Sequence, residues 1–178
     1  NEKLKIEKNR YVLITEDRIS YIGSEPPQEY HGREVDGKGK LLMSGFFNAH
    51  AHSPMTLMRG YGENMILQDW LTKKIFPFED KLYGEAVYWG TMLAMAESLR
   101  FGIVSTSDMY YFCDDMVRAV EESGAKANIS RSITSFAEGS VKNNDSYREA
   151  EALIRDYHGA AEGRILIDAS IHAEYTNT

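Results

Sequence analysis

Cysteine is almost absent from the sequence, because Cys113 is the single one among 178 residues. No disulfide bond can form within the chain, which fits a reducing compartment, and we expect a cytoplasmic location. No stretch approaches the roughly 18 consecutive apolar residues of a membrane-spanning helix. No basic segment followed by an apolar one resembles a signal peptide. These absences exclude a disulfide-stapled scaffold and predict no association with a membrane.

Positive charge is also scarce. The 20 lysine and arginine residues are outnumbered by 27 aspartate and glutamate residues, and the formal net charge is −7. Surfaces that bind nucleic acid or anionic membranes are usually basic. The charge therefore argues against either as the main partner. Hydrophobic residues make up 43% and charged residues 26% of the chain, as in ordinary globular proteins.

The pattern of apolar and polar residues changes near residue 43. Residues 1–43 are strand-like and rich in turns, and the β-prone runs 11–14 and 19–22 predict a hairpin. From residue 41 onward, apolar runs alternate with segments of helical period. The predicted strands are 46–50, 103–107, 127–131 and 165–170, and the predicted helices are 84–101, 114–123 and 147–157. Such alternation is typical of a parallel α/β sheet.

Polar side chains gather at the carboxyl ends of these predicted strands. They are His50 and His52, Asp108, Arg131 and His172. In a (β/α)8 barrel this edge is the active-site face. A complete barrel takes about 250 residues and eight strands, so four strands predict half a barrel.

His50 and His52 flank one residue at the end of the first of these strands. Alternate residues of a strand point to the same face, so the two imidazoles can bind one divalent ion. Zinc, iron, nickel and copper all accept imidazole, so the pair does not identify the metal. Two polar residues at a strand-to-loop junction are the alternative interpretation, since the pattern is short. A catalytic zinc ion usually has three protein ligands, so further ligands are expected elsewhere.

The segment 43–52 carries a family resemblance. It reads MSGFFNAHAH and resembles the first barrel strand of the amidohydrolase superfamily, in which Asn-Ala-His-x-His follows a Pro-Gly-Phe run. Ser44 stands where that family usually has proline. Residues 35–41, VDGKGKL, are similar to the family's approach from a small β-sandwich domain. The resemblance implies that residues 1–43 are part of that β-sandwich domain. It also implies that residues 44–178 are the first four βα units of a (β/α)8 TIM barrel.

Downstream segments narrow the resemblance to the 5-methylthioadenosine and S-adenosylhomocysteine deaminases and their chlorohydrolase relatives. The matching segments are SPMTLMRG (53–60), QDWL (68–71), IFPFE (75–79), VYWGT (87–91), YHGAA (157–161) and IHAEYT (171–176). None is specific singly, but together they span nearly the whole chain. The resemblance implies a hydrolase that releases ammonia from adenosine derivatives through a metal-activated water. One divalent ion is expected, zinc first, with iron, nickel or manganese as alternatives.

The same resemblance assigns metal and ribose contacts to particular residues. His50 and His52 match metal ligands. Glu79 matches a glutamate that binds the ribose hydroxyls, and a carboxylate can accept both hydrogens. From the sequence alone, a solvated acid is the favoured interpretation of Glu79.

Three further residues match substrate contacts. Arg131 matches an arginine near the substrate's amino-acid carboxylate, which its planar fork suits; an arginine paired with an acid is the alternative. His172 matches a histidine that contacts the nucleoside, and Trp70 matches a residue that closes over the purine. A structural histidine and an ordinary packed tryptophan are the alternatives for these two.

Several groups of the family's site are not in the sequence. A third histidine ligand, an acid–base glutamate, a further histidine and a metal-binding aspartate lie on later strands in this family. The sequence stops at Thr178, so the resemblance implies that these groups lie beyond it. Asp108 receives no role, and Cys113 is expected to be inert.

Two other functions stay open. The first is another amidohydrolase activity, on a triazine, guanine or cytosine. The second is a non-catalytic fragment or binding module that lacks a complete metal site. Half a barrel leaves an exposed strand edge at which a second copy of the chain can pair, so a homo-oligomer is compatible with the sequence. The partner that the resemblance implies is a small nucleoside-like molecule.

Overall fold

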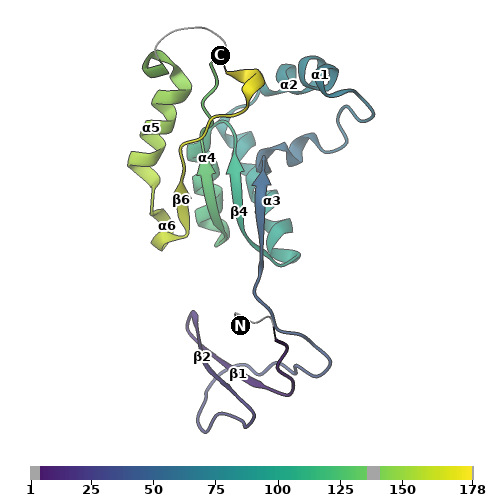
Figure 1. Ribbon diagram of the computed structural model, residues 1–178, viewed down its shortest axis with the longest axis vertical. Coiled ribbons are helices and arrows are strands. Elements are labelled where there is room, and N and C mark those ends of the chain that lie inside the picture. Colours follow the sequence, from purple (N-terminus) through teal and green to yellow (C-terminus); the bar gives the residue numbers. More distant parts are fainter. Residues whose placement is uncertain (1–4, 136–140, 178) are drawn as a thin grey trace. The chain divides into compact units, whose positions relative to one another are not determined.

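The computed structural model describes residues 5–135 and 141–177 (Figure 1). The chain divides into two compact units, of which the first ends at Met43 and the second begins at Ser44. Their assignment to a β-sandwich domain and a barrel remains a prediction.

The first unit contains one antiparallel hairpin. β1 (Tyr11–Thr15) pairs with β2 (Arg18–Gly23), as the sequence predicts. The connecting loop is Glu16 and Asp17, and Glu16 adopts the left-handed conformation with φ of 56°. Ile14, Ile19 and Ile22 are each more than half exposed. No hydrophobic residue described in this unit is buried, so the hairpin has no core of its own.

The second unit is built on a four-stranded parallel sheet. Its strands are β3 (Phe46–Ala51), β4 (Ile103–Met109), β5 (Lys126–Ser130) and β6 (Ile165–Ile167), and they lie side by side in sequence order. The connecting helices are α3 (Gly84–Arg100), α4 (Cys113–Ser123) and α5 (Asp145–Tyr157). The predicted alternation of strand and helix is confirmed.

Short helical turns complete the second unit. They are η1 (Ser53–Met58), α1 (Leu67–Trp70), η2 (Leu71–Ile75), α2 (Phe76–Glu79), η3 (Val141–Asn143), α6 (Ala160–Gly163) and η4 (Glu174–Thr176). The last strand is shorter than predicted and ends at Ile167 rather than at residue 170. Farther along, Ile171 forms only an isolated parallel bridge, with Ile133, so the ladder is not continued.

The main helices end where their sequences provide local stop signals. Gly102, which follows α3, and Gly124, which caps α4, have φ of +80° and +76°, a conformation that favours glycine. At the start of α5, the side chain of Asn144 accepts the amide hydrogen of Ser146 and caps the helix. None of the helices within the described residues has the length and apolar character needed to cross a membrane.

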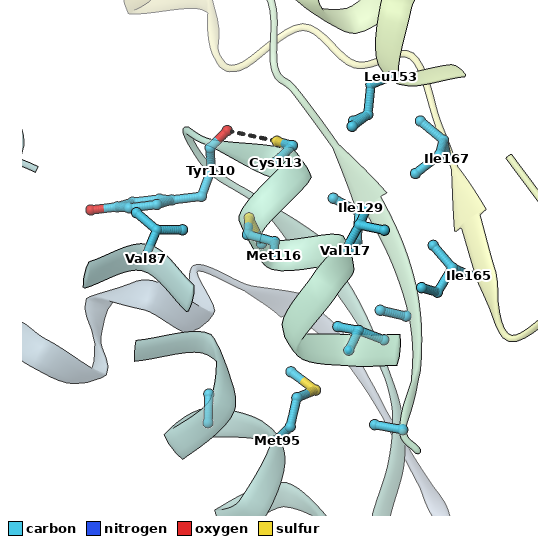
Figure 2. Packing of buried hydrophobic residues seen from close by; sticks show 14 of the residues in the cluster. Val87, Met95, Tyr110, Cys113, Met116, Val117, Ile129, Leu153, Ile165 and Ile167 are labelled. Atoms are coloured by element: carbon cyan, nitrogen blue, oxygen red, sulfur yellow. Dashed lines mark hydrogen bonds between the residues drawn. The ribbon is translucent and has the colours of Figure 1, made fainter. Parts of the chain in front are cut away.

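The core lies between the sheet and the helices (Figure 2). Ile129 of β5 and Ile165 of β6 are fully buried, and Met116 and Val117 of α4 are buried in the same cluster. The other face of the sheet is open, since Leu166 of β6 is 45% exposed between two buried neighbours. The core therefore fixes the strands from one side and leaves their carboxyl ends available for a site.

Candidate active site

A cleft of about 300 Å³ lies at the carboxyl ends of β4 and β5. The arrowheads of the sheet point toward the end of this unit where α1 and α2 lie (Figure 1). The cleft brings together five of the predicted site residues: His52, Trp70, Glu79, Arg131 and His172. They come from segments more than 100 residues apart in the sequence. A second hollow of about 330 Å³, between β3 and α3, contains only His52 of the predicted residues.

Apolar and aromatic side chains form much of the remaining wall of the cleft. The other lining residues are Met55, Leu67, Leu71, Ile75, Phe76, Met109, Tyr110, Tyr111, Ser132, Thr134 and Thr176. An apolar wall with a few convergent polar groups is typical of small-molecule sites.

His50 and His52 point their rings to the same side at the end of β3. The ring centroids are 4.8 Å apart, with an angle of 82° between the planes. Between them, Ala51 pairs with Asp108 of β4 after an irregularity in the register. Such irregularities often re-aim side chains next to active sites. The two imidazoles are therefore close enough to bind one metal ion, although their role as metal ligands stays a prediction.

A hydrogen bond fixes the orientation of the His52 ring. Its Nδ1 lies 2.8 Å from the carbonyl oxygen of Met109. A carbonyl can only accept, so Nδ1 carries the hydrogen, and the neutral form of the ring has its lone pair at Nε2. A histidine that donates one ring N–H to a backbone carbonyl is typical of metal sites, because the bond fixes the tautomer. Within residues 5–135 and 141–177, no three His, Cys, Asp or Glu side chains form a metal-binding group, so His50 and His52 stand as a pair.

Glu79, at the end of α2, is not the solvated acid that the sequence alone favoured. It is partly buried, and the hydroxyl of Tyr110 donates to its Oε1 at 2.8 Å. Burial raises the pKa of the Glu79 carboxyl, while the hydrogen bond from Tyr110 and the charge of His52 lower it. Burial also raises the pKa of Tyr110, and Glu79 adds to that shift. The phenol therefore keeps its proton and acts as the donor.

Arg131 is paired with an acid, as the alternative interpretation expected, and its contact with a substrate stays a prediction. Its Nε lies 2.6 Å from Oε2 of Glu149, so it is paired with an acid. Its Nη1 donates to the carbonyl of Ser132 at 2.8 Å, and the guanidinium lies 4.9 Å from the centre of the Tyr111 ring. The side chain is only 13% exposed and lines the cleft. A guanidinium held in this way is oriented before any ligand binds.

His172 and Trp70 both line the cleft, although they are far apart in the sequence. Nδ1 of His172 is 3.0 Å from Oγ1 of Thr176, whose hydroxyl donates to the carbonyl of Ala173. Burial lowers the pKa of His172, and the charges of His52 and His50 lower it further. Trp70 is partly buried and packs against the core cluster. A role for Trp70 in closing over a substrate stays a prediction.

Sequence reasoning missed the support that β4 gives to the site. Asp108 is 3% exposed, and its Oδ1 accepts the backbone amide hydrogen of Ser53 at 3.1 Å. Burial raises the pKa of this carboxyl, and hydrogen bonds from Ser53 oppose the shift. An acid at the end of a buried strand was the available signal, but its partner is 55 residues away. By contrast, burial raises the pKa of Cys113 to about 12, which keeps the thiol protonated.

Comparison with known families and proteins points in one direction. The model of the amidohydrolase family matches residues 41–178. The 5-methylthioadenosine/S-adenosylhomocysteine deaminase of Thermoanaerobacter pseudethanolicus is 37% identical over 175 residues, covering 98% of this chain and 40% of that protein. The 5'-deoxyadenosine deaminase of Methanoregula boonei is 39% identical over 167 residues, covering 92% of this chain and 38% of that protein.

Solved structures share the fold. The zinc complex of atrazine chlorohydrolase from Arthrobacter aurescens has a TM-score of 0.85 at 18% identity and covers 100% of this chain and 45% of its own. An adenosine deaminase from Xanthomonas campestris with bound zinc has a TM-score of 0.67 at 32% identity and covers 75% of this chain and 30% of its own. The chain thus spans about 40% of the length of the curated relatives it matches.

Proposed function

The chain belongs to the amidohydrolase family, and from this premise we propose that it is part of a metal-dependent hydrolase that deaminates adenosine derivatives. The proposed substrates are of the 5-methylthioadenosine or S-adenosylhomocysteine type. We also propose that its four parallel strands are the first half of a (β/α)8 barrel and that residues 1–43 belong to a β-sandwich domain.

One observation carries the proposal. A single cleft collects His52, Glu79, Arg131 and His172 from four separate parts of the chain. Each matches a residue that the resemblance assigned to metal or substrate. The two relatives reported above, both named as deaminases of adenosine derivatives, are 37% and 39% identical to the chain.

The donor set of the described chain fits a divalent metal ion. His50 and His52 would hold it, since their rings share one side and Nε2 of His52 is left with the lone pair. Zinc is the proposed ion because imidazole suits it and two similar structures are described with zinc. When bound, such an ion would supply hydroxide at neutral pH by lowering the pKa of its bound water to about 7.

The residues of the chain would then bind and orient the nucleoside. The Glu79 carboxylate accepts hydrogens from the ribose hydroxyls, and Arg131 holds the carboxylate of an amino-acid moiety. His172 contacts the base. The apolar wall and Trp70 pack against the purine and exclude water. The overall reaction would use one water molecule to replace the amino group of the purine by oxygen and would release ammonia. The acid–base glutamate of this step is expected beyond Thr178.

Ammonia release tests the proposal directly. The complete protein, loaded with zinc, is incubated with 5-methylthioadenosine or S-adenosylhomocysteine, and ammonia is measured against time. Release that depends on the metal supports the proposal. The absence of release in the presence of bound metal rejects it, and the absence of bound metal would favour a non-catalytic module.

A substrate panel separates the proposal from other activities of the family. Likeness to triazine and guanine hydrolases is below 25% identity and concerns the fold alone. Glu79→Ala should impair the turnover of ribose-bearing substrates far more than that of free bases. Equal losses on both classes would argue against ribose recognition by Glu79.

A further inference from the structure

The carboxyl end of β4 makes two adjacent contacts with the end of β3. The Asp108 carboxylate accepts the amide hydrogen of Ser53 at 3.1 Å, and the carbonyl of Met109 accepts the Nδ1 hydrogen of His52 at 2.8 Å. Neighbouring residues of β4 therefore hold the two residues that directly follow β3. The two bonds fix the backbone that leaves His52 as well as the ring itself.

Asp108 is an unusual residue for a packing role. Its side chain is 3% exposed, and its Oδ2 is buried without a hydrogen-bond partner among the described residues. A buried carboxylate with an unpaired oxygen costs free energy, whereas an apolar side chain of similar volume would not. Thr106, two residues earlier on the same face, is equally buried without such a charge. A feature that costs stability at this place calls for a role in the adjoining site.

We propose that Asp108 is a positioning residue for His52, which it serves by anchoring the amide of Ser53. This anchor fixes the direction in which the chain leaves β3. The ring of His52 then stays against the Met109 carbonyl, and its Nε2 is left to bind a metal ion. Without the anchor, the start of η1 moves and the ring loses its fixed orientation. The inference rests on the proposed function in one respect, because it takes His52 to be a metal ligand.

Metal affinity of the complete protein tests the inference. The metal-free protein is titrated with zinc in competition with a chromophoric chelator. Asp108→Leu fills the volume but removes the acceptor, and Asp108→Ala removes both. Each is expected to weaken zinc binding by about 10- to 100-fold, as the loss of a supporting contact typically does. Circular dichroism shows which of the two variants is folded. The zinc affinity of a folded variant decides the test, even if the other variant does not fold.

Two further variants distinguish positioning from general loosening. Asp108→Asn keeps a carbonyl oxygen for the Ser53 amide and should bind zinc within about threefold of the wild type. Thr106→Val is the matched control and should bind as the wild type does. A leucine variant that is stable but binds zinc normally would overturn the inference. So would an asparagine variant as weak as leucine, or an equal loss in Thr106→Val.

The outcome also separates this inference from the proposed function. A wild-type protein that binds no metal overturns the metal assignment and this inference with it. A wild-type protein that binds zinc, together with Asp108 variants of unchanged affinity, overturns only the role of Asp108.

Discussion

Residues 1–43 and 44–178 differ in how much of their apolar surface is buried. The hairpin of the first unit leaves Ile14 and Ile19 about 60% exposed, whereas Ile129 and Ile165 of the second unit are fully buried. All of the predicted metal and substrate residues lie in the second unit. The difference indicates that the site residues require strands that are packed against a core. The first unit has the sequence pattern of strands without the burial that stabilises them.

The largest expected effect contrasts two histidines of the two units. His50→Ala in the complete protein should weaken zinc binding on the order of 10³-fold, since each ligand supplies a large share of the binding free energy. His31→Ala changes an exposed histidine of the first unit and should leave affinity unchanged. Chelator competition measures both. Equal zinc affinities for the two variants would contradict the assignment of a metal site to the second unit.

The next effect concerns the core beneath the site. Ile129→Ala removes a fully buried side chain and should lower the free energy of unfolding by about 3 kcal/mol, through lost burial and the cavity that remains. Urea denaturation followed by circular dichroism measures it. A loss below about 1 kcal/mol would mean that the sheet is not packed as tightly as its burial indicates.

A smaller effect is expected where the core meets the cleft. Tyr110→Phe removes the hydrogen bond to Glu79 and should raise KM for a ribose-bearing substrate about tenfold, with kcat less affected. The matched control is Tyr88→Phe, which removes a tyrosine–glutamate bond of 2.6 Å, to Glu122, away from the cleft. Steady-state kinetics should show no change in the control. Parallel changes in both variants would indicate a loss of stability rather than of substrate binding.

Tyr110→Phe should also shift the pH dependence of kcat/KM. The raised pKa of Glu79 means that its carboxylate is lost at a higher pH than for an ordinary glutamate as pH falls. Substrate binding should therefore weaken on the acid side. Tyr110 lowers this pKa, so Tyr110→Phe should move the acid limb of kcat/KM to higher pH. An unmoved or opposite limb would contradict the assignment of Glu79 as the titrating acceptor.

The smallest effect is expected for an exposed residue of the hairpin, in contrast to the buried Ile129. Ile14→Ala alters a 60% exposed side chain of the hairpin and should change the free energy of unfolding by less than about 0.5 kcal/mol. Denaturation under the conditions used for Ile129→Ala gives a direct comparison. A loss as large as that of Ile129→Ala would show that residues 1–43 are buried in the complete protein.

Much of the fold could be predicted because it depends on local pattern. The hairpin, the parallel strands and the three long helices follow from periodicity and from stop signals such as Gly102 and Gly124. The end of β6 could not be predicted, because pairing with β5 rather than apolar sequence determines where the ladder stops. Glu79 was misjudged as a solvated acid for the same reason, since its partner Tyr110 is 31 residues away.

The sequence by itself determined the alternation of strands and helices, the His50-Ala51-His52 spacing that places two rings on one side, and the family. Tertiary structure alone decided which groups hold those side chains: Met109 for His52, Tyr110 for Glu79 and Glu149 for Arg131. The physical reason is distance along the chain. Periodicity records which face of its own element a residue occupies, whereas hydrogen bonds between residues tens of positions apart exist only once the sheet has packed.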